Sequence, residues 1–194
     1  MPDSRPSPWR HLPNAITVSR VVLVLPIGWA ILSREPKSAL FLIALAGFTD
    51  GLDGFLARRF GWQSRLGGVL DAVADKTLLI SCFVLLAVEG LVPWWLAGLV
   101  CGRDLVIAVG ALAWRLLIGV LRPEPSYLSK ACTLLQILYL LAVLAAAAGW
   151  PVPPLVPLAG VVAALCVASG ADYVWRWSRR ARLALSQRAD GGSR

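Results

Sequence analysis

The chain has 194 residues, of which 58% are hydrophobic and 15% charged, and its mean hydropathy is +0.70. So apolar a chain is not soluble as a monomer. Several stretches of about 20 apolar residues fit the hydrocarbon thickness of a bilayer. The sequence therefore predicts an all-α integral membrane protein in one compact bundle. The formal net charge of +8 favours anionic lipid headgroups over nucleic acid as partners, because the basic residues are dispersed at predicted helix ends without an aromatic-rich binding element.

Histidine and cysteine usage argues against two classes of site. His11 is the only histidine, which argues against a histidine-based metal site and against a Ser-His-Asp triad. The cysteines lie inside predicted spans without the close pairing of a metal knuckle, so we interpret them as small buried apolar residues that form no disulfide. They are Cys82, Cys101, Cys132 and Cys166.

The first predicted element is a polar, proline-rich arm over residues 1–14. It lacks the length and cleavage site of a removed signal peptide, and we expect it to stay on the cytoplasmic side. The first span is predicted from about Ile16 to Ser33. Asn14 or Thr17 would cap its helix, and Arg20 lies one turn deeper.

The second and third spans, about Ala39 to Phe60 and Leu66 to about Val88, carry four carboxylates at their adjoining ends. These are Asp50, Asp53, Asp71 and Asp75. Spacings of three and four residues place the acids of each helix on one face. A turn over residues 61–64 would make the two helices antiparallel neighbours with opposed acidic faces.

Opposed carboxylates predict a bound cation. In a low-dielectric setting they raise one another's pKa and become protonated unless a cation lies between them, and oxygen ligands at this density suit Mg²⁺ or Mn²⁺, with two ions expected. Gly54, Ala57 and Gly67 leave room for a bulky ligand, and Arg58 would clamp a phosphate. The alternative is that the small residues only permit close helix packing and that the charges lie in a solvated loop. Acids at helical spacing within apolar helices argue against it.

The fourth span, about Trp94 to Val120, contains Arg103 beside Asp104. Adjacent side chains on a helix point about 100° apart, so these two need not pair. A charge at this depth is expected to face the bundle interior, where Arg103 would be either a structural tie to a carboxylate or a contact to a substrate phosphate.

Basic residues flank the linker to the fifth span, about Ser129 to Gly149. Arg115, Arg122 and Lys130 would build a pocket for a lipid or polyol phosphate, or only enforce orientation in the membrane. The sixth span runs to about Trp177.

The predicted organisation is therefore an N-terminal cytoplasmic arm at 1–14, a six-helix transmembrane catalytic domain at 15–178 and a basic cytoplasmic tail at 179–194. Six spans place both termini on one side, together with most of the arginines. The positive-inside rule makes that side cytoplasmic, so the aspartates open toward the cytosol.

The acidic segment resembles a known signature. Its pattern, Asp50-x2-Asp53-Gly54-x2-Ala57-Arg58-x8-Gly67-x3-Asp71-x3-Asp75, matches that of the CDP-alcohol phosphatidyltransferase family at every fixed position. The family also has a Pro-Asn-x2-Thr/Ser-x2-Arg segment near its active site, which this chain matches with Pro13, Asn14, Thr17 and Arg20.

The resemblance implies a membrane enzyme with six transmembrane helices, usually a homodimer, that moves a phosphatidyl group from CDP-diacylglycerol to an alcohol and releases CMP. By the family pattern, Asp50, Asp53 and Asp71 are metal ligands, and Asp75 both touches metal and accepts the proton of the attacking hydroxyl. The residues implied to border the CDP portion are Gly54, Ala57, Arg58 and Gly67.

The resemblance indicates the acceptor alcohol less directly than it indicates the type of reaction. The segments His11 to Val24, Leu45 to Lys76 and Gly102 to Gln136 are most similar to eukaryotic-type cardiolipin synthases, whose acceptor is phosphatidylglycerol. Phosphatidylglycerophosphate synthases, whose acceptor is glycerol 3-phosphate, share both motifs but usually carry Arg-Glu in place of Arg103-Asp104. Both groups usually have proline at the position of Ala72. We expect phosphatidylglycerol, with glycerol 3-phosphate as the alternative.

Two other classes use similar chemistry. A membrane prenyltransferase binds a diphosphate with acidic clusters and Mg²⁺, but this chain has one paired cluster and too few spans for that fold. An ion-coupled transporter uses intramembrane acids for ions, and release of CMP would exclude it.

Overall fold

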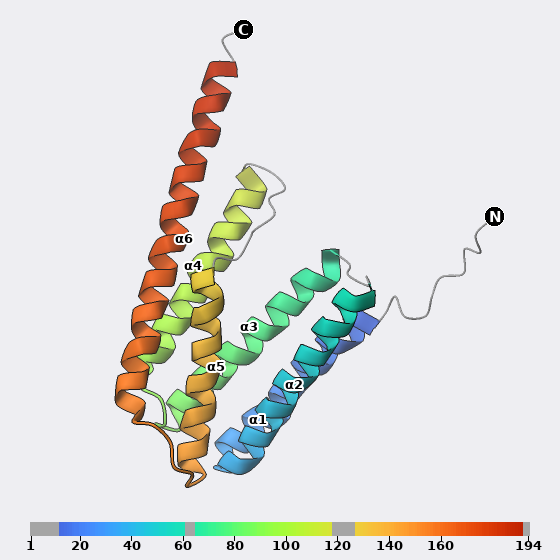
Figure 1. Ribbon diagram of the computed structural model, residues 1–194, viewed down its shortest axis with the longest axis vertical. Helices are drawn as coiled ribbons and strands as arrows, with labels where there is room; N and C mark the ends of the chain where they lie inside the picture. The colour runs from blue at the N-terminus through green and yellow to red at the C-terminus, as the bar shows by residue number, and fades with distance from the viewer. Residues whose placement is uncertain (1–11, 61–64, 118–126, 192–194) are drawn as a thin grey trace, which may run out of the picture. The chain divides into compact units, whose positions relative to one another are not determined.

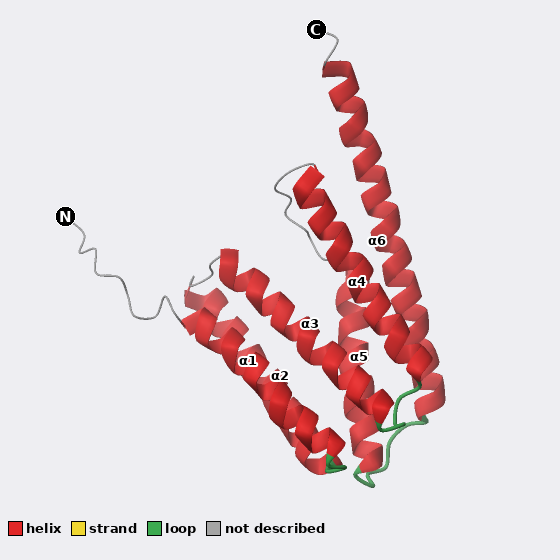
Figure 2. Cartoon of the chain, turned by 180° about the vertical axis from the view of Figure 1, so that it is seen from behind, coloured by secondary structure: helices red, strands yellow, loops and turns green. Residues whose placement is uncertain are grey.

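The computed structural model describes residues 12–60, 65–117 and 127–191, with side chains over 22–49, 73–113 and 127–179 (Figure 1). Every regular element in these ranges is an α-helix (Figure 2). The helices are α1 (Leu12–Leu32), α2 (Pro36–Phe60), α3 (Arg65–Val88), α4 (Trp94–Leu117), α5 (Tyr127–Ala147) and α6 (Leu155–Gly191). Their order and positions follow the predicted spans.

Helices α1 and α6 extend furthest beyond their predicted spans. Helix α1 begins at Leu12 rather than near Ile16, because Pro13 falls in the first turn, where the missing N–H of proline is tolerated. Helix α6 continues to Gly191, through most of the predicted tail. Residues 179–190 contain neither glycine nor proline and are rich in Arg, Ala and Leu, which favour helix.

Three helices end in the same hydrogen-bonded cap. After α3, the N–H of Gly90 donates to the carbonyl of Ala87 (3.1 Å) and that of Leu91 to the carbonyl of Leu86 (2.9 Å). The same pair of bonds closes α5 around Gly149 and α1 around Arg34. The residue at the turn has a positive φ in each case, 73° at Gly90, 84° at Gly149 and 55° at Arg34. Glycine is the usual residue here, so Arg34 is held in a strained conformation.

The helices form two compact units, which are described separately. The first contains residues 1–93 and 140–153, and the second contains residues 94–139 and 154–194. In the first unit, α1 packs against both α2 and α3 (Figure 1). Its buried core includes Ile27, Phe83 and Leu86. In the second unit, α4 packs against α6, with Val100, Tyr139 and Val162 buried.

Helices α2 and α3 were predicted to be direct neighbours. Over the described residues, α1 contacts both of them and no contact joins α2 to α3. Of the four acids predicted to form the opposed faces, Asp50, Asp53 and Asp71 lie outside the part of the chain with described side chains. The opposed acidic faces therefore stay a prediction.

The described residues include three helical segments long and apolar enough to cross a bilayer: Trp94–Ala113, Tyr127–Ala147 and Leu155–Arg179. Shorter apolar segments, Val22–Leu32 and Pro36–Thr49, lie in α1 and α2. Large apolar side chains are exposed along these helices, among them Leu25, Phe41, Leu105 and Val156. A hydrocarbon environment covers such side chains, and the chain is a membrane protein.

Candidate active site

The predicted metal ligands lie on two helices. Asp50 and Asp53 are in the second half of α2, and Asp71 and Asp75 are in the first half of α3. Both segments are helical, as the prediction that the two acids of each pair share a face requires. Of Asp50, Asp53 and Asp71 the structure describes the helical backbone but not the side chains, and the same holds for the surroundings of Gly54, Ala57, Arg58 and Gly67.

Asp75 is the acid whose side chain is described. It is half-buried, beside the fully buried Ala74, and it has at least one interaction partner, as does Lys76. The described residues contain no group of three or more His, Cys, Asp and Glu side chains that could hold a metal ion. Since only one of the four aspartates falls within that range, a metal site built from all four is still a prediction.

The donor set itself fits a hard cation. All four predicted ligands are carboxylates, and neither histidine nor cysteine occurs between Asp50 and Asp75. Oxygen ligands alone suit Mg²⁺ or Mn²⁺, whereas softer metals prefer nitrogen and sulfur.

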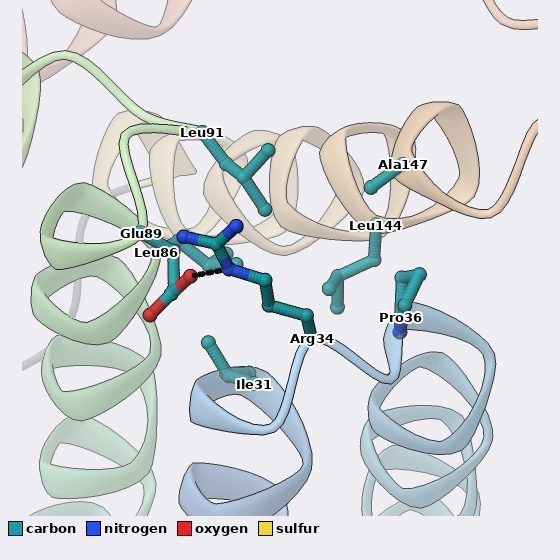
Figure 3. A pocket seen from close by; sticks show the side chains of 8 residues that line it. All are labelled: Ile31, Arg34, Pro36, Leu86, Glu89, Leu91, Leu144 and Ala147. Carbon is teal, nitrogen blue, oxygen red and sulfur yellow. Dashed lines mark hydrogen bonds and ion pairs between the residues drawn. The ribbon is translucent and has the colours of Figure 1, made fainter.

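A pocket of about 260 Å³ lies in the first unit (Figure 3). Its lining residues are Ile31, Arg34, Pro36, Leu86, Glu89, Leu91, Leu144 and Ala147. Arg34 donates from Nε to Oε2 of Glu89 at 2.9 Å, which ties the α1–α2 turn to the end of α3. Pro36 is 14 residues from Asp50, or about 21 Å along α2 at 1.5 Å per residue. The pocket therefore lies at the opposite end of α2 from the aspartates.

A second group of polar residues, the Arg103 cluster, lies in the second unit and consists of Arg103, Asp104, Ser129 and Ser169. Arg103 and Asp104 are buried, with exposed fractions of 5% and 6%. Nη1 of Arg103 pairs with Oδ1 of Asp104. Nη2 donates to Ser129 Oγ and to Ser169 Oγ, at 2.7 Å each. One guanidinium thus joins α4 to α5 and α6.

Adjacent helical residues therefore do pair here, because the long arginine side chain can fold back onto its neighbour. The expectation that Arg103 faces the interior is confirmed, since its side chain is buried among three helices. Of the two roles left open for Arg103, the structure contains the tie to a carboxylate, which is that of Asp104. Contact with a substrate phosphate remains a prediction for this residue.

Two cysteines and a glutamine lie beside this cluster. The Sγ atoms of Cys132 and Cys166 are 3.6 Å apart, and Nε2 of Gln136 donates to Cys166 Sγ at 3.1 Å. All four cysteines are free, and three of them are buried, whereas Cys101 is half-buried. The interpretation of Cys82, Cys132 and Cys166 as small buried residues is confirmed, and the absence of a disulfide stays a prediction.

The partners of Arg103 were missed by sequence reasoning. Ser129, Cys132 and Gln136 recur at three- and four-residue intervals on α5, and Cys166, Ser169 and Tyr173 do so on α6. Polar residues at this spacing in an apolar helix share one face, which was the available signal. This spacing identifies a polar face on each helix, but it does not identify the residue that binds to that face.

The predicted acceptor contacts are only partly described. Lys130 is exposed in the first turn of α5, and its Nζ lies 5.7 Å from the centroid of the Tyr127 ring. Asn14, Thr17 and Arg20 lie in the first turns of α1 and Arg115 in the last turn of α4, but their side chains are outside the described residues. Arg122 lies wholly outside the described ranges.

Comparison with known proteins identifies the family. The sequence profile described as CDP-alcohol phosphatidyltransferase matches residues 10–171, which is more than half of the chain. That range includes both motifs found in the sequence, the helices α1 to α5 and the first part of α6.

Similar proteins include enzymes named for two different products. The chain is 35% identical to cardiolipin synthase (CMP-forming) of Rattus norvegicus over 160 residues, which are 74% of this chain and 53% of that protein. It is 34% identical to cardiolipin synthase (CMP-forming) of Streptomyces coelicolor over 152 residues, 72% of this chain and 67% of that protein. It is 36% identical to "Probable phosphatidylglycerophosphate synthase" of Mycobacterium tuberculosis over 109 residues, 53% of this chain and 52% of that protein.

The chain spans about half to two thirds of the length of these relatives. The aspartate signature and the match over residues 10–171 agree, and the chain belongs to the CDP-alcohol phosphatidyltransferase family.

Proposed function

We propose that this protein transfers the phosphatidyl group of CDP-diacylglycerol to phosphatidylglycerol, forming cardiolipin and releasing CMP. The observation that carries the proposal is the family match over residues 10–171, together with similar proteins named cardiolipin synthase (CMP-forming). The Asp50–Asp75 signature lies inside that match and supplies the carboxylates that the reaction needs.

The aspartates would hold the metal. Asp50, Asp53, Asp71 and Asp75 fit Mg²⁺ or Mn²⁺ by donor type, and four carboxylates are enough for two ions. When bound, the ions neutralise the pyrophosphate and the charge that grows on the leaving CMP. Arg58 would bind a phosphate of the CDP portion, and the missing side chains at Gly54, Ala57 and Gly67 leave space for the nucleotide.

The proposed reaction is a direct in-line displacement. The acceptor hydroxyl oxygen forms a bond to the phosphatidyl phosphorus while the bond from that phosphorus to the CMP oxygen breaks. The hydroxyl proton passes to the carboxylate of Asp75, which is half-buried in α3 and so within reach of a partly solvated substrate. Inversion of configuration at phosphorus is the expected result, and retention would contradict direct attack.

Glycerol 3-phosphate is the second candidate acceptor. The similarity to a protein named as a phosphatidylglycerophosphate synthase supports it, although that similarity covers 53% of this chain. The wider coverage by proteins named cardiolipin synthase, 74% and 72% of the chain, favours phosphatidylglycerol. With either acceptor, Asn14, Thr17, Arg20, Arg115, Arg122 and Lys130 are the proposed contacts.

The proposed setting is a bacterial-type inner membrane, crossed six times, with both termini and the aspartates on the cytoplasmic side. Three segments satisfy the length and hydropathy of a span, and shorter apolar segments lie in α1 and α2. The arginines after α2 and α4 and at the end of α6 would all face the cytosol, as the positive-inside rule requires. A homodimer is proposed from the family resemblance.

An acceptor panel tests this function. Purified protein in detergent is given Mg²⁺ and CDP-diacylglycerol with phosphatidylglycerol, glycerol 3-phosphate, inositol phosphate or serine, and CMP and lipid product are both measured. Cardiolipin from phosphatidylglycerol is expected. Phosphatidylglycerophosphate from glycerol 3-phosphate would establish the alternative, and no CMP with any acceptor would contradict both.

A further inference from the structure

The buried ion pair of the Arg103 cluster calls for an explanation other than stability. Taking Arg103 and Asp104 out of water costs free energy that their mutual attraction only partly offsets, and apolar side chains of similar volume often stabilise a protein more. In a membrane segment, such charges are rare and mark functional positions.

The two hydroxyls bound by Nη2 of Arg103 occupy different places. Ser169 lies in the middle of α6 and is buried, with an exposed fraction of 1%. Ser129 is half-buried and is the third residue of α5. The first turn of a helix has N–H groups without intrahelical partners and frays readily. A bond from a buried guanidinium to Ser129 therefore fixes a helix end that would otherwise be free to move.

The residue after Ser129 is Lys130, whose side chain is exposed. Its ammonium lies near the Tyr127 ring, and no ion pair between it and a carboxylate is found within the described ranges. An ammonium at the first turn of a helix is well placed for an anion, because the positive end of the helix dipole adds to its charge. A lipid or polyol phosphate has the matching charge.

We propose that Arg103 is a positioning residue for the acceptor. Through Ser129 it fixes the first turn of α5, and with it Lys130, which binds the phosphate of the acceptor. This inference rests on the proposed function and adds to it how the acceptor phosphate is held. In this arrangement Arg103 acts through Ser129 rather than by touching the substrate, because its side chain is buried and its two Nη atoms bind Asp104, Ser129 and Ser169.

The two serines provide a matched pair of variants. Ser129→Ala and Ser169→Ala each remove one hydroxyl bonded at 2.7 Å to the same nitrogen, but only the first releases the start of α5. We expect Ser129→Ala to raise the KM for phosphatidylglycerol about 5-fold, the effect of one lost hydrogen bond, with the KM for CDP-diacylglycerol unchanged. Ser169→Ala should change either KM less than about 2-fold. Ser129→Thr, which keeps the hydroxyl, should restore the acceptor KM.

A double variant tests whether the effect passes through Lys130. Lys130→Ala alone should raise the acceptor KM at least as much as Ser129→Ala, and the double variant should be no worse than Lys130→Ala, because both changes remove one interaction. Equal effects of the two serine variants on the acceptor KM, or additive effects of the Ser129 and Lys130 variants, would overturn the proposal.

A measurement independent of turnover separates this inference from the proposed function. Wild-type and variant protein in detergent are treated with a water-soluble N-hydroxysuccinimide ester of acetate. The rate at which Lys130 is acetylated is followed by mass spectrometry. Ser129→Ala should change this rate at least about 2-fold relative to wild type and Ser169→Ala should not, since only Ser129 lies in the first turn of α5. Absence of CMP with every acceptor would refute the function. An unchanged Lys130 rate in Ser129→Ala would refute the positioning role.

Discussion

Asp75 and the three other aspartates of the signature are the residues on which the proposed chemistry depends. Without a cation, four carboxylates on two joined helices repel one another, and some must bind protons in a low-dielectric setting. With a cation they stay ionised and can orient a pyrophosphate. Their role is therefore inseparable from the metal, and metal removal is the first test at this scale.

Chelation should abolish activity reversibly. Dialysis against EDTA is expected to lower the rate of CMP release at least about 100-fold, because the aspartates alone cannot stabilise the leaving phosphate. Adding Mg²⁺ or Mn²⁺ should restore the rate, whereas adding Na⁺ at the same ionic strength should not. Full activity after exhaustive chelation would contradict an aspartate-bound metal.

The helix caps show how single residues shape the elements. Arg34 takes the position that glycine occupies after α3 and α5, with a φ of 55°, and it also pairs with Glu89. Arg34 is 83% exposed, so the ion pair contributes little to stability. The left-handed backbone conformation costs a residue with a Cβ about 1 kcal/mol.

Arg34→Gly and Arg34→Ala separate these two contributions. Both variants lose the bond to Glu89, but only glycine relieves the backbone strain, so Arg34→Gly should be more stable than Arg34→Ala by about 1 kcal/mol. Thermal unfolding in detergent, followed by far-ultraviolet circular dichroism, measures the difference. An Arg34→Ala protein as stable as the Arg34→Gly protein would show that the turn is not strained.

Close packing of α4 on α6 depends on a glycine. A Cβ at Gly110 would lie 2.9 Å from Cε1 of Tyr173. The tyrosine cannot easily give way, because its hydroxyl donates to the carbonyl of Ile107 at 2.9 Å and its ring lies 5.1 Å from that of Trp177. The second unit thus has a tightly packed contact between its two long helices.

Gly110→Ala should therefore destabilise the protein by about 1–3 kcal/mol, the usual cost of overpacking. Gly98→Ala in the same helix is the matched control, since nothing lies within 4 Å of its Cβ position. There the better helix propensity of alanine should leave stability unchanged or slightly raised. Equal unfolding temperatures for the two variants would contradict the packing of Tyr173 against Gly110.

At the scale of the whole molecule, the sequence predicts the six helices well because hydropathy and turn residues act locally. The predicted ends of the third and fifth spans, about Val88 and Gly149, lie within two residues of the ends of α3 and α5. The extension of α6 to Gly191 was missed, because its arginines suggested a solvated tail although their helix propensity is high. The start of α1 was missed because a proline was taken to precede the helix.

The candidate site likewise has a part that the sequence could predict and a part that it could not. The aspartates could be predicted because their spacing is local and their chemistry is distinctive. The bonds of Arg103 to Ser129 and Ser169 join residues 26 and 66 positions away, and only tertiary packing brings them together. The packing of α1 between α2 and α3 over the described residues was likewise outside what helical periodicity can predict.

The most direct test of the central claim is the stoichiometry of CMP and cardiolipin formed by the purified protein from CDP-diacylglycerol and phosphatidylglycerol. One CMP per cardiolipin is expected, and Asp75→Asn should lower the rate at least about 100-fold, as loss of a general base and metal ligand does. Glu89→Gln, a carboxylate change at the far end of α3, should keep the wild-type rate. Cardiolipin without CMP, or an Asp75→Asn protein as active as Glu89→Gln, would contradict phosphatidyl transfer at the aspartates.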